Sequence, residues 1–160
     1  MSPFKRYDIR GRLGIDLDES VSRRIAQAFA TVTGADTVVL ARDCRDSSPA
    51  LARAVADGLV RRGVRVLDLG LAGTEEMYFA TAHLGAGGGI MVTASHNPRD
   101  YNGMKLVGPG AVPLPDADFA RIRALSDSDQ DRLPGGTIED SSGIRAAYID
   151  RVAAVVGPVG

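Results

Sequence analysis

This chain of 160 residues has one cysteine, almost no net charge and no long apolar run. Because Cys44 has no second cysteine to pair with, an internal disulfide is excluded, and a lone thiol offers no metal-ligand spacing. Lys and Arg number 19 against 20 Asp and Glu, so no broad attraction to nucleic acid or to a membrane surface is expected. No apolar segment follows Lys5 and Arg6 as a secretion signal requires, and none approaches the ~18 residues of a membrane span. The chain is therefore expected to be a single cytoplasmic domain with its own core.

Apolar runs rich in β-branched residues alternate with segments of helical periodicity in the first part of the chain. The pattern predicts strands at 37–41, 64–70 and 89–93, and helices over 18–33, 48–63 and 74–85, with Asp18 and Ser48 as N-caps. Right-handed βαβ crossovers make such strands parallel and place the loops that follow them along one edge.

The remaining segments are less regular. Alternation around Gly11 predicts a short strand or hairpin near residues 4–14. A turn at 99–103 should lead into an antiparallel strand at 104–108, which would bring Lys105 near Ser95. After it we expect a short helix capped by Asp116, an exposed polar loop over 126–143, and a last helix with Ile144, Tyr148, Val152 and Val155 on one face.

The polar hexapeptide Thr-Ala-Ser-His-Asn-Pro, residues 93–98, breaks off from an apolar strand. Ligands of open α/β sheets bind beyond the carboxyl ends of strands, so this is where chemistry is expected. In an extended segment neighbouring side chains point to opposite faces, which would make His96 a poor base for Ser95 and disfavours a serine hydrolase. From these residues alone, a structural turn and a functional site are both open.

Two further features have simple explanations. The glycine-rich run 85–89 closes a helix and precedes a strand, whereas phosphate-cradling glycines follow a strand and open a helix, so a flexible connection is favoured over a dinucleotide site. Arg10 and Arg42 stand at predicted strand ends, where a guanidinium can bind a phosphate. Solvated arginines are the simpler interpretation unless both converge on the serine.

Three motifs become specific when they are taken together. They are Phe-Lys-Arg-Tyr-Asp-Ile-Arg-Gly at 4–11, the hexapeptide at 93–98, and Asp-Tyr-Asn-Gly-Met-Lys at 100–105. In this order and spacing they resemble the N-terminal-domain motifs of the α-D-phosphohexomutases, the phosphomannomutase/phosphoglucomutase superfamily. Residues 73–80 and 101–107 resemble the bacterial phosphomannomutase branch in particular, and the resemblance covers nearly the whole chain.

The resemblance implies a fold and a reaction. The fold is an α/β one, a three-layer α/β/α domain with a mixed, mostly parallel sheet, the first domain of the phosphohexomutase fold. The reaction interconverts mannose 6-phosphate and mannose 1-phosphate. Ser95 would be phosphorylated and pass its phosphoryl group to the sugar phosphate, and the bisphosphorylated hexose would reorient and return its other phosphate.

The resemblance also implies roles for individual residues. One oxygen of the Ser95 phosphate would be a ligand of Mg²⁺, an ion that prefers oxygen, with the other ligands in the family's second domain. Phosphate contacts are implied for Arg10 and Lys105, substrate contact for Tyr7, and shaping of the loop for His96 and Asn97. The candidate catalytic residues are Ser95, Arg10, Lys105 and His96, and the candidate substrate-binding residues are Tyr7, Arg10, Asn97 and Lys105.

The family has four domains, and residues 1–160 match the first. The metal loop, the sugar-recognition residues and a phosphate-binding loop belong to the others, so the missing domains are expected partners and this chain alone is expected to be inactive. Ala41 stands where a glycine is expected before Arg42. Three alternatives stay open: a domain of a phosphoglucomutase, a domain of a phosphoglucosamine mutase, or a free-standing phosphate-binding module without catalysis.

Overall fold

The computed structural model describes residues 2–6 and 8–157. Its strands are β1 (Ile9–Arg12), β2 (Thr37–Arg42), β3 (Arg65–Leu71), β4 (Gly88–Val92), β5 (Tyr101–Val107) and β6 (Thr137–Asp140). Its helices are α1 (Glu19–Thr33), α2 (Ser48–Val60), α3 (Thr74–His83), α4 (Asp116–Leu125) and α5 (Ile144–Val156), with a 3₁₀ turn at Pro109–Ala111.

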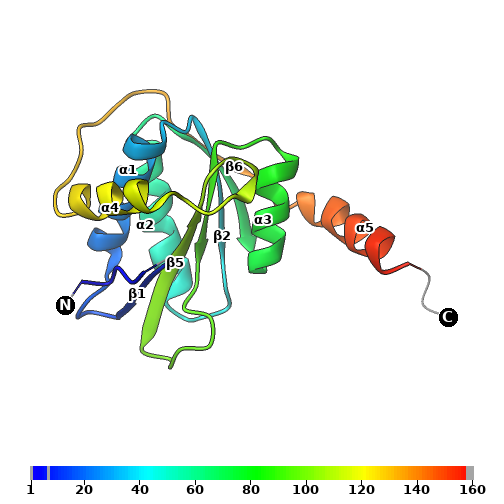
Figure 1. Cartoon of the computed structure of the whole chain (residues 1–160), viewed down its shortest axis with the longest axis horizontal. Coiled ribbons are helices and arrows are strands. Elements are labelled where there is room, and N and C mark those ends of the chain that lie inside the picture. Colours follow the sequence, from blue (N-terminus) through cyan, green and yellow to red (C-terminus); the bar gives the residue numbers. More distant parts are fainter. Residues whose placement is uncertain (1, 7, 158–160) are drawn as a thin grey trace.

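The strands form one six-stranded sheet in the order β1-β5-β4-β2-β3-β6. β2 pairs in parallel with β3 and β4, and β3 pairs in parallel with β6, whereas β5 runs antiparallel to both β4 and β1. α1, α2 and α4 cover one face and α3 covers the other (Figure 1). The expected three-layer domain with a mixed, mostly parallel sheet is therefore confirmed.

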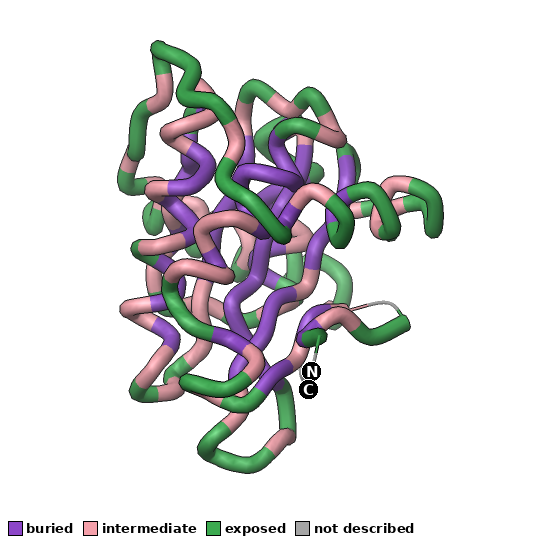
Figure 2. Tube along the Cα trace, turned by 90° about the vertical axis from the view of Figure 1, so that its left-hand side faces the viewer, coloured by how far each residue is buried: buried purple, intermediate pink, exposed green. Residues whose placement is uncertain are grey.

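The sheet separates two apolar cores. Alternate residues of the buried strands point to opposite faces, so Ile90 and Val92 of β4 pack with α1 and α2, while Met91 packs with Met77 of α3. Figure 2 shows the buried residues concentrated in the central strands and the exposed ones in the connecting loops. This rigid centre holds the loops at the strand ends.

In the glycine-rich run 85–89, residues 85–87 form the predicted connection from α3 to β4, whereas Gly88 and Gly89 belong to β4 and serve its packing. Gly88 and Gly89 are buried strand residues. A Cβ on Gly88 would lie 2.7 Å from a ring atom of Phe29 on α1, and one on Gly89 would lie 2.4 Å from Oγ1 of Thr81 on α3. Helices press on β4 from both sides at the point where it has no side chains.

Several predicted boundaries were wrong. The loop predicted over 126–143 contains β6, and the predicted turn at 99–103 already contains the start of β5. α2 begins at Ser48, so its N-cap is Ser47, which makes no side-chain cap hydrogen bond, and the hydroxyl of Ser48 donates to the carboxylate of Asp43. Asp116 is the first residue of α4 and not its cap. The caps of α1 are as predicted: Asp18 accepts from the N–H of Val21, and Gly34 has a left-handed φ of 65°.

α5 packs through its first half and projects from the body through its second (Figure 1). Arg145 bonds to the buried carboxylate of Glu76 at 3.0 Å, and the ring of Tyr148 lies 5.6 Å from that of Phe79. Val152 and Val155, predicted on the same face, are exposed. Within residues 2–6 and 8–157, no helix is both long and apolar enough to cross a membrane.

The close approach of α3 to β4 makes Gly89→Ala a destabilising change. The added methyl group meets Oγ1 of Thr81 at 2.4 Å and the sulfur of Met77 at 2.6 Å, so α3 must shift. We expect a loss of about 1–3 kcal/mol in the free energy of unfolding, measured by urea denaturation. Gly143→Ala is the control, since its Cβ meets nothing within 4 Å, and equal losses in the two variants would contradict the packing explanation.

The edge strand β6 is joined to β3 by an exposed bidentate ion pair. Arg65 donates to Glu139 at 2.6 and 2.7 Å, which holds the pKa of Glu139 below its ordinary 4.5. Because the folded-state pKa is lowered, the stabilisation from this pair is fully present above the ordinary pKa and is lost as the pH falls through the folded-state value. We expect an NMR titration to show the low pKa, and Arg65→Met to raise it. The pKa of Asp140, lowered by hydrogen bonds from Ser142, should not follow.

Candidate active site at the serine loop

The serine loop, residues 93–98, leaves β4 at the carboxyl edge of the parallel strands. Thr93 and Ala94 are buried, and the N–H of Thr93 donates to the carbonyl of Gly103 on β5 at 3.0 Å. Ser95, the next residue, is exposed to solvent. The loop thus presents one hydroxyl at the end of a fully buried strand.

Ser95 has a left-handed backbone, with φ of 56°. This conformation costs an L-residue roughly 1–2 kcal/mol and persists where surrounding contacts impose it. Its N–H donates to Oγ1 of Thr93 at 2.9 Å, and the side-chain amide of Asn97 donates to the carbonyl of Ala94 at 2.9 Å. Asn97 therefore bonds within the loop through its own side chain.

Asp43 and Arg45, from the loop between β2 and α2, contact the serine loop from beside it. The Asp43 carboxylate accepts from Oγ1 of Thr93 at 2.8 Å and lies 3.4 Å from Nε of Arg45. The guanidinium of Arg45 donates to four carbonyl oxygens, those of Ser95, Asn97, Pro98 and Tyr101. Neither residue was among the sequence candidates. Their position just after a strand end could have indicated them, but only Arg10 and Arg42 were considered at such positions.

His96 lies beside Ser95, contrary to the prediction that the two side chains point to opposite faces. Nδ1 of His96 is 3.3 Å from Oγ of Ser95. The prediction assumed an extended backbone, and the left-handed Ser95 turns the chain instead. Among the described residues no carboxylate pairs with His96, so nothing there orients the ring as a hydrolase triad does.

Arg10 and Lys105 reach the same face of the sheet. Arg10 pairs with Gly103 of β5, and Gly103 in turn meets Thr93, so these three residues form one row across the strands. Lys105 lies two residues further along β5, roughly 7 Å from that row, and alternation directs it to the same side as Gly103. Nε of Arg10 is 2.9 Å from the carboxylate of Asp8. Gly103 permits the close approach of β1, since a Cβ there would lie 1.9 Å from the carbonyl oxygen of Ile9.

Arg42 does not converge on the serine loop. It lines a hollow of about 520 Å³ with residues of α2, including Arg53 and Asp57, and its guanidinium lies 3.4 Å from the carbonyl of Asp43. The simpler interpretation of Arg42 thus fits the structure. Tyr7, the remaining candidate, lies outside the described residues.

The described residues around Ser95 offer few oxygen ligands for the expected Mg²⁺. Within the described part of the chain, no group of three His, Cys, Asp or Glu side chains could hold an ion. Asp43, whose carboxylate is already hydrogen-bonded to Thr93, Ser48 and Arg45, is committed to the loop. These residues by themselves do not form a Mg²⁺ site, and Ser95 would offer one ligand only.

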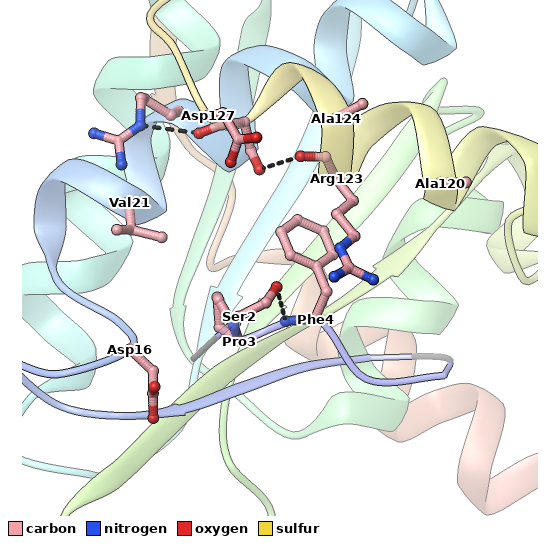
Figure 3. Close-up of a pocket in the computed structure, with 11 residues that line it drawn as sticks. Ser2, Pro3, Phe4, Asp16, Val21, Ala120, Arg123, Ala124 and Asp127 are labelled. Carbon is pink, nitrogen blue, oxygen red and sulfur yellow. Dashed lines mark hydrogen bonds between the residues drawn. The ribbon is translucent and has the colours of Figure 1, made fainter.

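A separate hollow of about 450 Å³ lies between the N-terminal segment, α1 and α4 (Figure 3). Ser2, Phe4, Asp16 and Arg123 are among its lining residues, and the ring of Phe4 meets that of Phe119 edge-on at 5.6 Å. No residue of the serine loop contributes to its lining. The hollow is therefore distinct from the site built around Ser95.

Residues 1–132 match the family model described as phosphoglucomutase/phosphomannomutase, alpha/beta/alpha domain I. The chain belongs to the phosphoglucomutase/phosphomannomutase family. A phosphomannomutase of Salmonella montevideo is 48% identical over 159 residues, which cover 96% of this chain and 34% of that protein. A protein of Xanthomonas campestris pv. campestris named phosphohexose mutases is 56% identical over 111 residues, covering 69% of this chain and 25% of its own.

A solved structure from the same family agrees with the fold. A phosphoglucomutase/phosphomannomutase family protein from Burkholderia thailandensis superposes with a TM-score of 0.83 at 38% identity, over 95% of this chain and 35% of that one. The suspected resemblance is thus confirmed at the level of family and fold. This member of the phosphoglucomutase/phosphomannomutase family spans about a third of the length of the Salmonella and Burkholderia proteins.

The strained backbone of Ser95 should affect the stability of its variants, whatever the function of the serine. Glycine adopts a positive φ without penalty, so Ser95→Gly should be more stable than Ser95→Ala by about 1 kcal/mol in urea unfolding. Ser142, which has no positive φ, is the control position, and there the order should reverse because glycine increases the entropy of the unfolded chain. The same order at both positions would contradict strain at Ser95.

Proposed function

We propose that this chain carries the phosphoserine of a phosphohexomutase, with Ser95 giving and receiving the phosphoryl group. The observation that supports this most directly is the placement of Ser95. Its hydroxyl is exposed on a rigid loop, in a domain of this family, with Arg10 and Lys105 directed to one face of the adjoining strands.

The proposed cycle consists of two phosphoryl transfers. In the first, the bond between phosphorus and Oγ of Ser95 breaks while a hydroxyl oxygen of the hexose phosphate bonds to that phosphorus, so that the hydroxyl proton is lost and Oγ is reprotonated. The resulting bisphosphorylated hexose reorients. In the second transfer Oγ loses its proton and bonds to the phosphorus of the other phosphate, whose bond to the sugar oxygen breaks, and that oxygen is protonated to leave the isomeric monophosphate.

Arg10 and Lys105 supply the positive charge that such a transfer requires. Phosphoryl transfer depends mainly on positioning and on neutralising charge on the oxygens of the transferred group. Lys105 has no carboxylate partner among the described residues, and Arg10 is bound to Asp8 through Nε, on one edge of its guanidinium. Tyr7 and Asn97 are proposed to contact substrate. His96 is proposed to exchange the proton of the serine, and the 3.3 Å between its Nδ1 and Oγ of Ser95 supports this role.

Mg²⁺ belongs to the proposal through a single ligand, an oxygen of the Ser95 phosphate. When bound, the ion would neutralise charge on the transferred group. Its other ligands would come from outside the described residues, which form no metal cluster. No step of the cycle above is assigned to it.

Mannose phosphates are the proposed substrates, and hexose phosphates more broadly are the second candidate. The Salmonella relative at 48% identity is named a phosphomannomutase, which favours the first. The Xanthomonas relative at 56% identity is named for hexoses in general, which favours the second. Competition between mannose 1-phosphate and glucose 1-phosphate, assayed with the longer protein that contains this sequence, separates them.

Phosphorylation of Ser95 is the direct test. We expect the purified chain, incubated with mannose or glucose 1,6-bisphosphate, to gain one phosphoryl group by intact mass without sustained turnover of mannose 1-phosphate. Ser95→Ala should abolish the gain, and Ser128→Ala, at an exposed serine elsewhere, should not. Lys105→Ala should slow it by about 10²-fold, the typical effect of removing one charge-stabilising donor. The proposal would be contradicted if both this chain and the longer protein that contains it stayed unmodified with the two bisphosphates.

A further inference from the structure

Arg45 has an unusual set of partners for an arginine beside a phosphoryl-transfer site. Its side chain is 16% exposed, and both terminal nitrogens of its guanidinium are committed to backbone carbonyls. Nη2 donates to Ser95 at 2.8 Å and Asn97 at 2.7 Å, and Nη1 donates to Pro98 at 2.8 Å and Tyr101 at 3.1 Å. The serine loop is folded around this one cation.

The two peptide groups that flank Ser95 are therefore held by Arg45 and Asp43, directly on one side and through Thr93 on the other. The carbonyl of Ser95 accepts from Arg45, and its N–H donates to Thr93, whose hydroxyl donates to Asp43. Asp43 in turn lies 3.4 Å from Nε of Arg45 and accepts from the N–H of Arg45 at 3.1 Å. Fixing both peptide planes fixes φ and ψ of Ser95, and with them the direction of the Cα–Cβ bond that carries Oγ.

We propose that Arg45, together with Asp43, is a positioning residue that holds Ser95 in its left-handed conformation for phosphoryl transfer. The geometric part of this inference stands on the hydrogen bonds alone, and its catalytic part rests on the proposed function. Arg45 is not a phosphate ligand in this role, because its terminal nitrogens are occupied by carbonyl oxygens. Arg10 and Lys105 neutralise the phosphate, while Arg45 fixes the backbone conformation of the serine that carries it.

Arg45→Lys separates positive charge from geometry. Lysine keeps the charge, but its three donors sit on one nitrogen and cannot reproduce a planar fork with two arms. Arg99→Lys is the matched control, because Arg99 belongs to the turn after the serine loop, is 91% exposed and pairs with the exposed Asp46.

The first measurement is amide hydrogen exchange at Ser95 by NMR on this chain. Losing a charged hydrogen bond on the adjoining carbonyl should raise the exchange rate of the Ser95 N–H by about tenfold in Arg45→Lys. Arg99→Lys should leave it unchanged. If Arg45→Lys does not fold, Arg45→Gln is measured in the same way. An exchange rate equal to that of the wild type would overturn the geometric inference.

The second measurement is the rate of Ser95 phosphorylation by a hexose 1,6-bisphosphate. Misplacement of a reacting oxygen should lower the maximal rate of Arg45→Lys by about 10²-fold with little change in half-saturating bisphosphate. A loosened Ser95 amide with an unchanged maximal rate would show a merely structural role and overturn the catalytic part. If the wild type is phosphorylated neither as this chain nor within the longer protein that contains it, the proposed function fails, and the exchange measurement still decides the geometric part.

Discussion

Asp43 and Arg45, an ion pair in the loop after β2, hydrogen-bond to the serine loop after β4, and the shape of the serine loop depends on these bonds. Four carbonyls of residues 95–101 turn toward one guanidinium. Backbone carbonyls at a bend need donors, and the guanidinium of Arg45 supplies one to each of these four, although the carbonyl of Pro98 also accepts from the N–H of Tyr101. Hydrogen bonds to a charged group contribute about 1.5–3 kcal/mol each, so four of them outweigh the roughly 1–2 kcal/mol of strain in a left-handed serine.

That arrangement requires a sheet whose strand ends do not move. β4 is buried along its whole length, between a core that includes Phe29 and a second core that includes Met77. Glycines at 88 and 89 let both helices approach closely enough to hold the strand. The rigid centre of the sheet keeps the end of β4 in place, so that Ser95 beyond it can stay exposed and strained.

Local patterns predicted well the elements that local forces decide. α1 has its predicted cap and stop because Asp18 and Gly34 act on neighbouring residues. β6 was missed because its short, mostly exposed segment has no clear alternation, and its stability comes from pairing with β3 some 70 residues away. Ser48 was assigned as a cap because its competing partner, Asp43, becomes visible only in three dimensions. For the same reason Arg42 was considered and Arg45 was overlooked, because the carbonyl partners of Arg45 lie about 50 residues away in the sequence.

The sequence by itself determined the class of the fold and the family, and it made Ser95 the candidate serine, because these follow from hydrophobic periodicity and from contiguous motifs. Only the tertiary structure decided how that serine is held. The four hydrogen bonds from Arg45 come from a residue about 50 positions away that meets the serine loop at one sheet edge, and the left-handed turn at Ser95 brings His96 into contact with it. Motif spacing shows which residues are present, whereas the direction in which a side chain leaves the backbone depends on the peptide planes around it.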